Sequence, residues 1–272
     1  MNFQAFLIGS QVAVTLVALL YSSWSDYKTR EVSNWVWAVY APIAIALSIA
    51  DLLLFDQSKL ILFGVSVGFT VGLAFLLFYC GAFGGADSKA LMCIAFSLPF
   101  APVALFTPLL ANSLSPVSQV IYPLTIFSNG VLFAAASCLY MVLRNFVWHK
   151  RNGKEMFSGT LAHESVGKKI LILITGYKVT IANLKEKWHV FPMEDVETEG
   201  ETAVKRKLVV IPSDDGRAGI VERLSNAAQA GKIDTYVWAT PGLPMLIFIT
   251  MGFIVALLCG DIVWMLVRLI LA

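Results

Sequence analysis

Residues 60–80 read LILFGVSVGFTVGLAFLLFYC and contain no charged side chain. At about 1.5 Å per residue, a helix of this length covers roughly 30 Å, the thickness of the hydrocarbon core of a bilayer. The whole chain has the same character: 58% of its 272 residues are hydrophobic and only 14% are charged. Soluble domains carry about a quarter charged residues. The sequence therefore predicts a polytopic α-helical membrane protein.

Six transmembrane helices are expected, because six segments are long and apolar enough to cross a bilayer. We place them at residues 6–23, 35–55, 60–80, 90–111, 119–143 and 242–267. No lysine or arginine precedes the first segment, and no small-residue cleavage pattern follows it. We therefore interpret it as a retained helix and not as a signal peptide.

Charge divides the chain into unlike parts. Residues 144–238 hold 15 of the 20 Lys and Arg and 12 of the 18 Asp and Glu. This predicts a membrane domain at 1–143, a small cytosolic α+β insert at 144–238, and the last transmembrane helix within 239–272. In the insert, short strands are expected at 170–175, 177–181, 187–192 and 207–211, a helix at 219–230 and a solvated acidic loop at 194–201.

The basic residues of the connecting segments predict the orientation. With the N-terminus outside, the inward loops carry Lys28, Arg30 and Lys89, and the basic insert is also inside. The outward segments keep only Lys59 and Arg268. We therefore expect a multi-pass protein of the cell membrane with its insert in the cytosol.

Metal, cofactor and nucleic-acid chemistry are not indicated. The four cysteines all lie in apolar runs, without the short spacing that a zinc or iron–sulfur site needs, at positions 80, 93, 138 and 259. The net charge of +2 is too small to indicate a nucleic-acid partner. We predict no metal and no cofactor, and we expect the bilayer itself to be a partner.

Carboxylates at a membrane are costly, so each is a functional candidate. Of the six acidic residues outside the insert, four are interpreted as loop, interfacial or ion-paired residues: Glu31, Asp51, Asp56 and Asp261. The remaining two, Asp26 and Asp87, are distant in sequence, yet the predicted orientation places both at the cytosolic membrane face. Singly, Asp26 could offset nearby basic residues and Asp87 could cap a helix. Together on one face, they indicate a catalytic pair.

Two neighbouring carboxylates cannot both ionise easily, so one pKa rises and the pair shares a proton. One carboxylate can then activate water while its protonated partner polarises a scissile carbonyl, which is the chemistry of aspartic proteolysis. The glycine-rich run at 81–86, directly before Asp87, would allow close approach of an extended peptide.

The two aspartates stand in the motifs Asp26-x3-Arg30-x-Val32-x-Asn34 and Gly84-Gly85-Ala86-Asp87-x-Lys89. These motifs resemble the paired signature of type IV prepilin and preflagellin (archaellin) peptidases, the GxGD class of membrane aspartyl proteases. The resemblance implies that Asp26 and Asp87 are catalytic. It gives substrate-contacting or loop-shaping roles to Gly84, Gly85, Arg30, Asn34 and Lys89.

The resemblance extends to the six-helix layout and to Thr240-Pro241-Gly242-Leu243-Pro244 at the entry to the last span. One departure is Ala86, which stands where the family has a glycine; an alanine would be strained there if that position needs a positive φ. Only 11 residues separate the first two spans, and they contain no cysteine. This is similar to the archaeal type and does not imply the methyltransferase activity of bifunctional bacterial members.

The resemblance implies a membrane aspartic endopeptidase that removes short basic leader peptides from type IV pilin-like or archaellin precursors at the cytosolic membrane face. Charge complementarity adds the hypothesis that the acidic stretch 194–201 attracts the leader. Three alternatives remain: an intramembrane protease of the presenilin or signal-peptide-peptidase kind, an ion-coupled transporter that uses Asp26 and Asp87 as ligands, and a scaffold in which the aspartates are incidental.

Overall fold

The computed structural model describes residues 3–110, 113–199, 203–210, 216–241 and 244–271. The chain forms two compact units, one from residues 1–134 and 244–272 and the other from residues 135–243. The division falls inside the long helix α6 (Tyr122–Asn152). Each unit is described by itself below.

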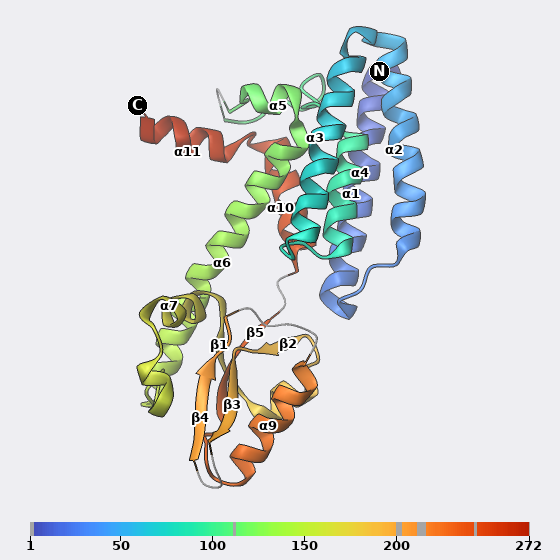
Figure 1. The fold of residues 1–272 in the computed structure, drawn as a ribbon. Helices are drawn as coiled ribbons and strands as arrows, with labels where there is room; N and C mark the ends of the chain where they lie inside the picture. The colour runs from blue at the N-terminus through green and yellow to red at the C-terminus, as the bar shows by residue number, and fades with distance from the viewer. Residues whose placement is uncertain (1–2, 111–112, 200–202, 211–215, 242–243, 272) are drawn as a thin grey trace. The chain divides into compact units, whose positions relative to one another are not determined.

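The first unit is helical and is built around a short central helix (Figure 1). It contains α1 (Phe3–Thr29), α2 (Asn34–Phe55), η1 (Gln57–Lys59), α3 (Leu60–Tyr79), α4 (Gly85–Ser97), α5 (Pro116–Val120), the first part of α6, α10 (Met245–Leu258) and α11 (Ile262–Leu271). Helix α4 packs against α1, α2, α3 and α10. Its buried face includes Ala90, Leu91 and Ile94, none of which is exposed. The small α4 thus forms the centre of the bundle.

Four helices among the described residues are long and apolar enough to cross a membrane: α1, α2, α6 and the continuous helix of η1 and α3. A fifth span is obtained if α10 and α11, which are bent by 69°, are counted as one. The molecule is therefore a largely helical protein with four to five candidate spans and a small sheet-containing region. The six spans predicted from the sequence are not confirmed.

The predicted span 90–111 is not one helix. Helix α4 already ends at Ser97, and Leu98 has left the helical region with φ −132° and ψ 68°. Pro99 follows directly, and proline disfavours a helical conformation for the residue before it. Pro102 and Pro108 lack the amide hydrogen that a continuing helix would require.

The predicted last span, 242–267, is interrupted near its end. Gly260 separates α10 from α11. Its φ of +86° is a value that glycine adopts readily but that a right-handed helix does not contain. Asp261 follows Gly260 and is only 6% exposed. Its carboxylate accepts a hydrogen bond of 2.7 Å from Ser115 Oγ, and Asn129 Nδ2 donates to the Gly260 carbonyl at 2.9 Å.

The second unit is a small α+β fold. Its elements after α6 are η2 (Gly159–His163), α7 (Val166–Thr175), β1 (Tyr177–Thr180), α8 (Ile181–Glu186), β2 (Val190–Pro192), β3 (Glu194–Glu199), β4 (Ala203–Leu208), α9 (Arg217–Gln229) and β5 (Tyr236–Pro241). Three antiparallel strands form a sheet in the order β1-β5-β2, and β3 pairs with β4 in a second one. Helix α9 contacts β2 and β3 and contributes Val221 and Leu224 to the core.

Two predictions for this unit are wrong. Residues 170–175 belong to helix α7, which begins after Ser165, whose hydroxyl accepts a hydrogen bond from the Lys168 amide. The acidic stretch 194–201 is not a solvated loop, because residues up to 199 form β3; residues 200 and 201 lie outside the described residues. The strand at the start of 177–181 and the helix at 219–230 are confirmed by β1 and α9.

Candidate active site

Asp26 lies in the last turns of α1, half-buried. One turn earlier, Ser23 fixes this part of α1 against α10. Its hydroxyl donates to the Leu246 carbonyl at 2.9 Å and lies 2.7 Å from Thr250 Oγ1. Because these hydroxyls are buried and satisfied, the end of α1 is held firmly and Asp26 has a defined position.

The chain then reverses sharply between α1 and α2. Arg30 has φ +58°, the only positive φ of a non-glycine residue among those described, and its amide donates to the Asp26 carbonyl at 3.0 Å. The Ser25 hydroxyl donates to the Glu31 carbonyl at 2.7 Å, and the Thr29 hydroxyl lies within hydrogen-bond distance of two carbonyls, 2.8 Å from that of Ser25 and 3.0 Å from that of Glu31. An L-residue in this conformation is strained and must be held by its surroundings, which these bonds do.

The Arg30 turn also has an electrostatic role. The Arg30 charge interacts with the Asp26 carboxylate, which lies one helical turn before it. The strained turn was not predicted from the sequence. The pattern of hydroxyl residues at 25 and 29 is a signal that could have indicated it, since such side chains bond to nearby backbone groups at helix ends.

Asp87 is placed by the first turn of α4. Its Oδ2 accepts a hydrogen bond of 3.0 Å from the amide of Gly84, the residue that caps the helix. A Cβ on Gly84 would lie 3.2 Å from this Oδ2, closer than such contacts usually are. Glycine at position 84 thus permits the close approach of the carboxylate, although its φ of −73° is one that any residue can adopt. Asp87 therefore also contributes to the N-terminal cap of α4, which was the alternative role considered for it.

The departure from the family pattern at Ala86 has little structural consequence. Ala86 lies inside α4 and has no positive φ, so its side chain causes no backbone strain. Gly85, the preceding residue, would place a Cβ in ordinary contact with Phe78 at 3.9 Å. A glycine before the second aspartate is not required by this backbone.

The two aspartates interact. Asp87 lies outside the candidate spans, and burial raises the pKa of its carboxyl to about 6. The hydrogen bond from Gly84 opposes this rise, and the negative charge of Asp26 adds to it. A carboxyl with such a pKa holds its proton for a substantial fraction of the time at mildly acidic to neutral pH. One protonated and one ionised carboxyl is the state that acid–base chemistry on a carbonyl requires.

The remaining predicted residues join the two motifs. Lys89 Nζ donates a hydrogen bond of 2.7 Å to Asn34 Oδ1, so the first residue of α2 is tied to the first turn of α4. Lys89 is exposed and its ammonium keeps further donors for another partner. Gly242 and Leu243 of the predicted entry motif lie outside the described residues.

Other groups in this region were not predicted from the sequence. Ser22, Trp37 and Ser88 each carry a buried polar atom with no hydrogen-bond partner in the part of the chain that the structure describes. Ser22 lies one turn before Asp26, and Ser88 follows Asp87. Among the described residues, no group of three His, Cys, Asp or Glu is placed to hold a metal ion.

Two models of known protein families match separate parts of the chain. Residues 13–144 match the model of the type IV leader peptidase family, and residues 168–262 match the model described as the archaeal peptidase A24 C-terminus, type II. The first match contains both aspartate motifs.

Characterised relatives match along almost the whole chain. The preflagellin peptidase of Methanococcus voltae is 28% identical over 258 residues, which cover 92% of this chain and 94% of the relative. That of Methanococcus maripaludis is 24% identical over 249 residues, covering 90% and 93%. That of Methanocaldococcus jannaschii is 21% identical over 260 residues, covering 94% of each. The chain therefore belongs to the type IV leader peptidase family and is an aspartic peptidase.

Proposed function

We propose that this peptidase removes the leader peptide from preflagellin (archaellin) precursors, with Asp26 and Asp87 as its catalytic pair. The observation that carries the proposal is that both aspartate motifs lie within the residues that match the type IV leader peptidase family, and the charge of Asp26 adds to the raised pKa of Asp87. The substrate class is supported by relatives named preflagellin peptidases, which this chain matches over at least 90% of its length. Type IV pilin-like precursors are the second substrate class to be tested.

The two aspartates have different surroundings, which supports different roles. Asp87 is held by the Gly84 amide in a largely buried place, and its raised pKa of about 6 leaves it half protonated at that pH. In its protonated form it polarises the scissile carbonyl by donating a hydrogen bond to the carbonyl oxygen. We assign the ionised role to Asp26, which lies one helical turn before the Arg30 charge and accepts a proton from the attacking water.

The glycines and polar residues around the pair are proposed to shape the site. Gly84 and Gly85 leave the backbone open beside Asp87, so that an extended peptide can approach. Arg30 stabilises the charge of Asp26, and the contact between Lys89 and Asn34 fixes the distance between the two motifs. Each of these five residues acts on the position or charge of the catalytic pair or of the peptide.

The acidic stretch is not proposed to attract the basic leader. Glu194 is fully buried against Arg206, and Asp195 is ion-paired with Arg223 at 2.8 Å. Glu197 is likewise paired, with Lys207. These three carboxylates are already paired within the fold, so they offer little charge to a substrate; the side chains of Glu199 and Glu201 are not among those described.

The test is cleavage of a preflagellin precursor by the purified protein reconstituted in membranes. Asp26→Asn and Asp87→Asn keep size and polarity but cannot share a proton, so each is expected to lose essentially all activity. Asp56→Asn is the matched control, because Asp56 is a carboxylate of the same unit that pairs with Lys59 at 2.7 Å. Normal cleavage by either of the first two variants would contradict the assignment of that aspartate to the catalytic pair.

The substrate class and membrane orientation need separate measurements. Parallel assays with preflagellin and prepilin-type precursors, at equal concentration, distinguish the two substrate classes through their kcat/KM values. We propose that the N-terminus is outside and that the insert 144–238 and the catalytic pair are cytosolic. Protease digestion of inside-out and right-side-out vesicles tests this, since the insert should be cut only when the cytosolic face is exposed.

A further inference from the structure

The second unit contains a basic cavity that the peptidase reaction does not use. It has a volume of about 480 Å³ and lies between the last turns of α6, strand β1 and helix α8. Four cationic residues line it: Arg144, Arg151, Lys178 and Lys187. Among the described lining residues there is no aspartate or glutamate. A concave surface with four positive charges and no carboxylate favours an anionic occupant.

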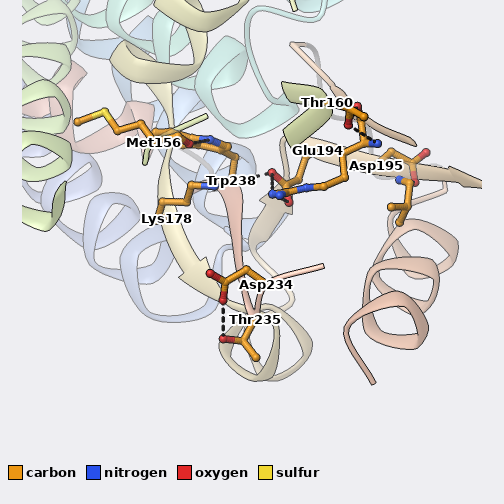
Figure 2. Close-up of polar contacts among 10 residues, drawn as sticks. Met156, Thr160, Lys178, Glu194, Asp195, Asp234, Thr235 and Trp238 are labelled. Atoms are coloured by element: carbon orange, nitrogen blue, oxygen red, sulfur yellow. Dashed lines mark hydrogen bonds and ion pairs between the residues drawn. The ribbon is translucent and has the colours of Figure 1, made fainter. Parts of the chain in front are cut away.

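Lys178 is the central observation. Its side chain is only 4% exposed, and its Nζ lies 4.8 Å from the centre of the Trp238 ring. Figure 2 shows it beside Trp238, with Glu194 nearby. The closest carboxylate oxygen, Glu194 Oε2, is 4.0 Å away, too far for a hydrogen bond. Glu194 therefore gives this ammonium an ion pair but no hydrogen bond, so an acceptor in the cavity would complete its contacts.

Glu194 is shared between Lys178 and a second cation, Arg206. Its two carboxylate oxygens accept hydrogen bonds of 2.8 and 3.0 Å from Arg206 Nη2. Glu194 thus faces two buried cations, and Asp234, whose charge also acts on Lys178, is itself paired with Lys154 at 2.6 Å, which leaves an excess positive charge. An anion in the cavity, which Lys178 lines, would neutralise it.

The other three cations that line the cavity are not paired with carboxylates among the described residues. The Arg144 guanidinium stacks on the Tyr177 ring with 3.9 Å between the charge and the ring centre, so the side chain is ordered although it is exposed. None of Arg144, Arg151 and Lys187 forms an ion pair with a carboxylate in the part of the chain that the structure describes. In the adjoining cavity, by contrast, Lys154 is paired with Asp234 at 2.6 Å.

We infer that this cavity binds a phosphate group. Phosphate offers several acceptor oxygens to cations that converge from different elements, and a planar guanidinium such as Arg144 can bind two of those oxygens at once. The same phosphate chemistry is offered by the headgroup of an anionic phospholipid and by a water-soluble phosphate compound. A phospholipid headgroup is supported as the source because α6, which carries Arg144 and Arg151, is long and apolar enough to cross a membrane.

The experiment uses the full-length protein and two probes. In one arm, inorganic pyrophosphate is titrated into protein in phosphatidylcholine nanodiscs, and binding is followed by calorimetry. In the other, native mass spectrometry compares retention of phosphatidylglycerol with that of phosphatidylcholine. The variant Arg144→Gln removes an exposed cation, so the fold should be kept, and thermal unfolding checks this. Lys232→Gln is the control, because Lys232 is an exposed lysine of the same unit that does not line the cavity.

Binding in either arm should weaken about tenfold or more in Arg144→Gln, and in Lys187→Gln as a second variant, because each loses a charge-assisted hydrogen bond. Lys232→Gln should bind as the wild type does. An effect confined to pyrophosphate assigns a soluble ligand, and one confined to phosphatidylglycerol assigns a lipid headgroup. The inference is overturned if neither probe binds, or if Lys232→Gln weakens binding as much as Arg144→Gln.

Discussion

Replacing Asp87 by asparagine is expected to stabilise the protein at neutral pH while abolishing cleavage. Burial raises the pKa of this carboxyl from 3.8 to about 6. A folded-state pKa above the unfolded value means that the folded protein binds more protons in this window, so stability falls as pH rises through it. At about 1.4 kcal/mol per pKa unit, the ionised carboxylate costs up to about 3 kcal/mol above pH 6.

Asparagine avoids this cost because it carries no charge, and its side-chain oxygen can still accept the hydrogen bond from the Gly84 amide. The expected gain in the free energy of unfolding is about 1–3 kcal/mol at pH 7.5 and close to zero at pH 4, where Asp87 is neutral in the folded protein. Thermal and denaturant unfolding in detergent at both pH values measure it. The reasoning is refuted if the variant shows no pH-dependent gain, or if Asp56→Asn shows the same one.

Three further predictions follow from packing and charge. Gly252→Ala should destabilise the first unit by about 1–3 kcal/mol, because the new Cβ would lie 2.6 Å from the Gly130 amide nitrogen. Gly64→Ala should leave the stability unchanged, because there is open space around Gly64. Thermal unfolding of both variants in detergent measures the difference. Glu194→Gln should cost about 3–5 kcal/mol by leaving buried cations unpaired, whereas Glu197→Gln, at an exposed pair, should cost under about 1 kcal/mol in denaturant unfolding. Burial lowers the pKa of Lys178 from 10.5 to about 8. The positive charges of Arg206 and Lys154 lower this pKa further, whereas the negative charges of Glu194 and Asp234 raise it. The unfolded chain therefore binds more protons between these values, so stability attributable to Lys178 should rise as pH increases from about 8 to 10.5. Unfolding curves of wild type and Lys178→Met should diverge over that range, and parallel curves would contradict the prediction.

The membrane character of the chain and the two aspartate motifs could be predicted from the sequence alone, because both depend on local information. An uncharged run such as 60–80 indicates a span whatever its neighbours are. The prolines at 99, 102 and 108 also indicate the break after Ser97, but the prediction of a span at 90–111 was based on its apolar composition and did not take them into account. Hydropathy measures how apolar a segment is and not whether its backbone can continue as a helix.

Contacts between distant residues were decided only by the tertiary structure. The stretch beginning at Glu194 is locally acidic and was expected in solvent, yet Glu194 is buried because Arg206 of β4 and Lys178 of β1 approach it. The contact between Lys89 and Asn34 likewise depends on elements that no local pattern brings together. The physical reason is that the energy of a buried charge is set by its partners, and those partners are known only once the chain has folded.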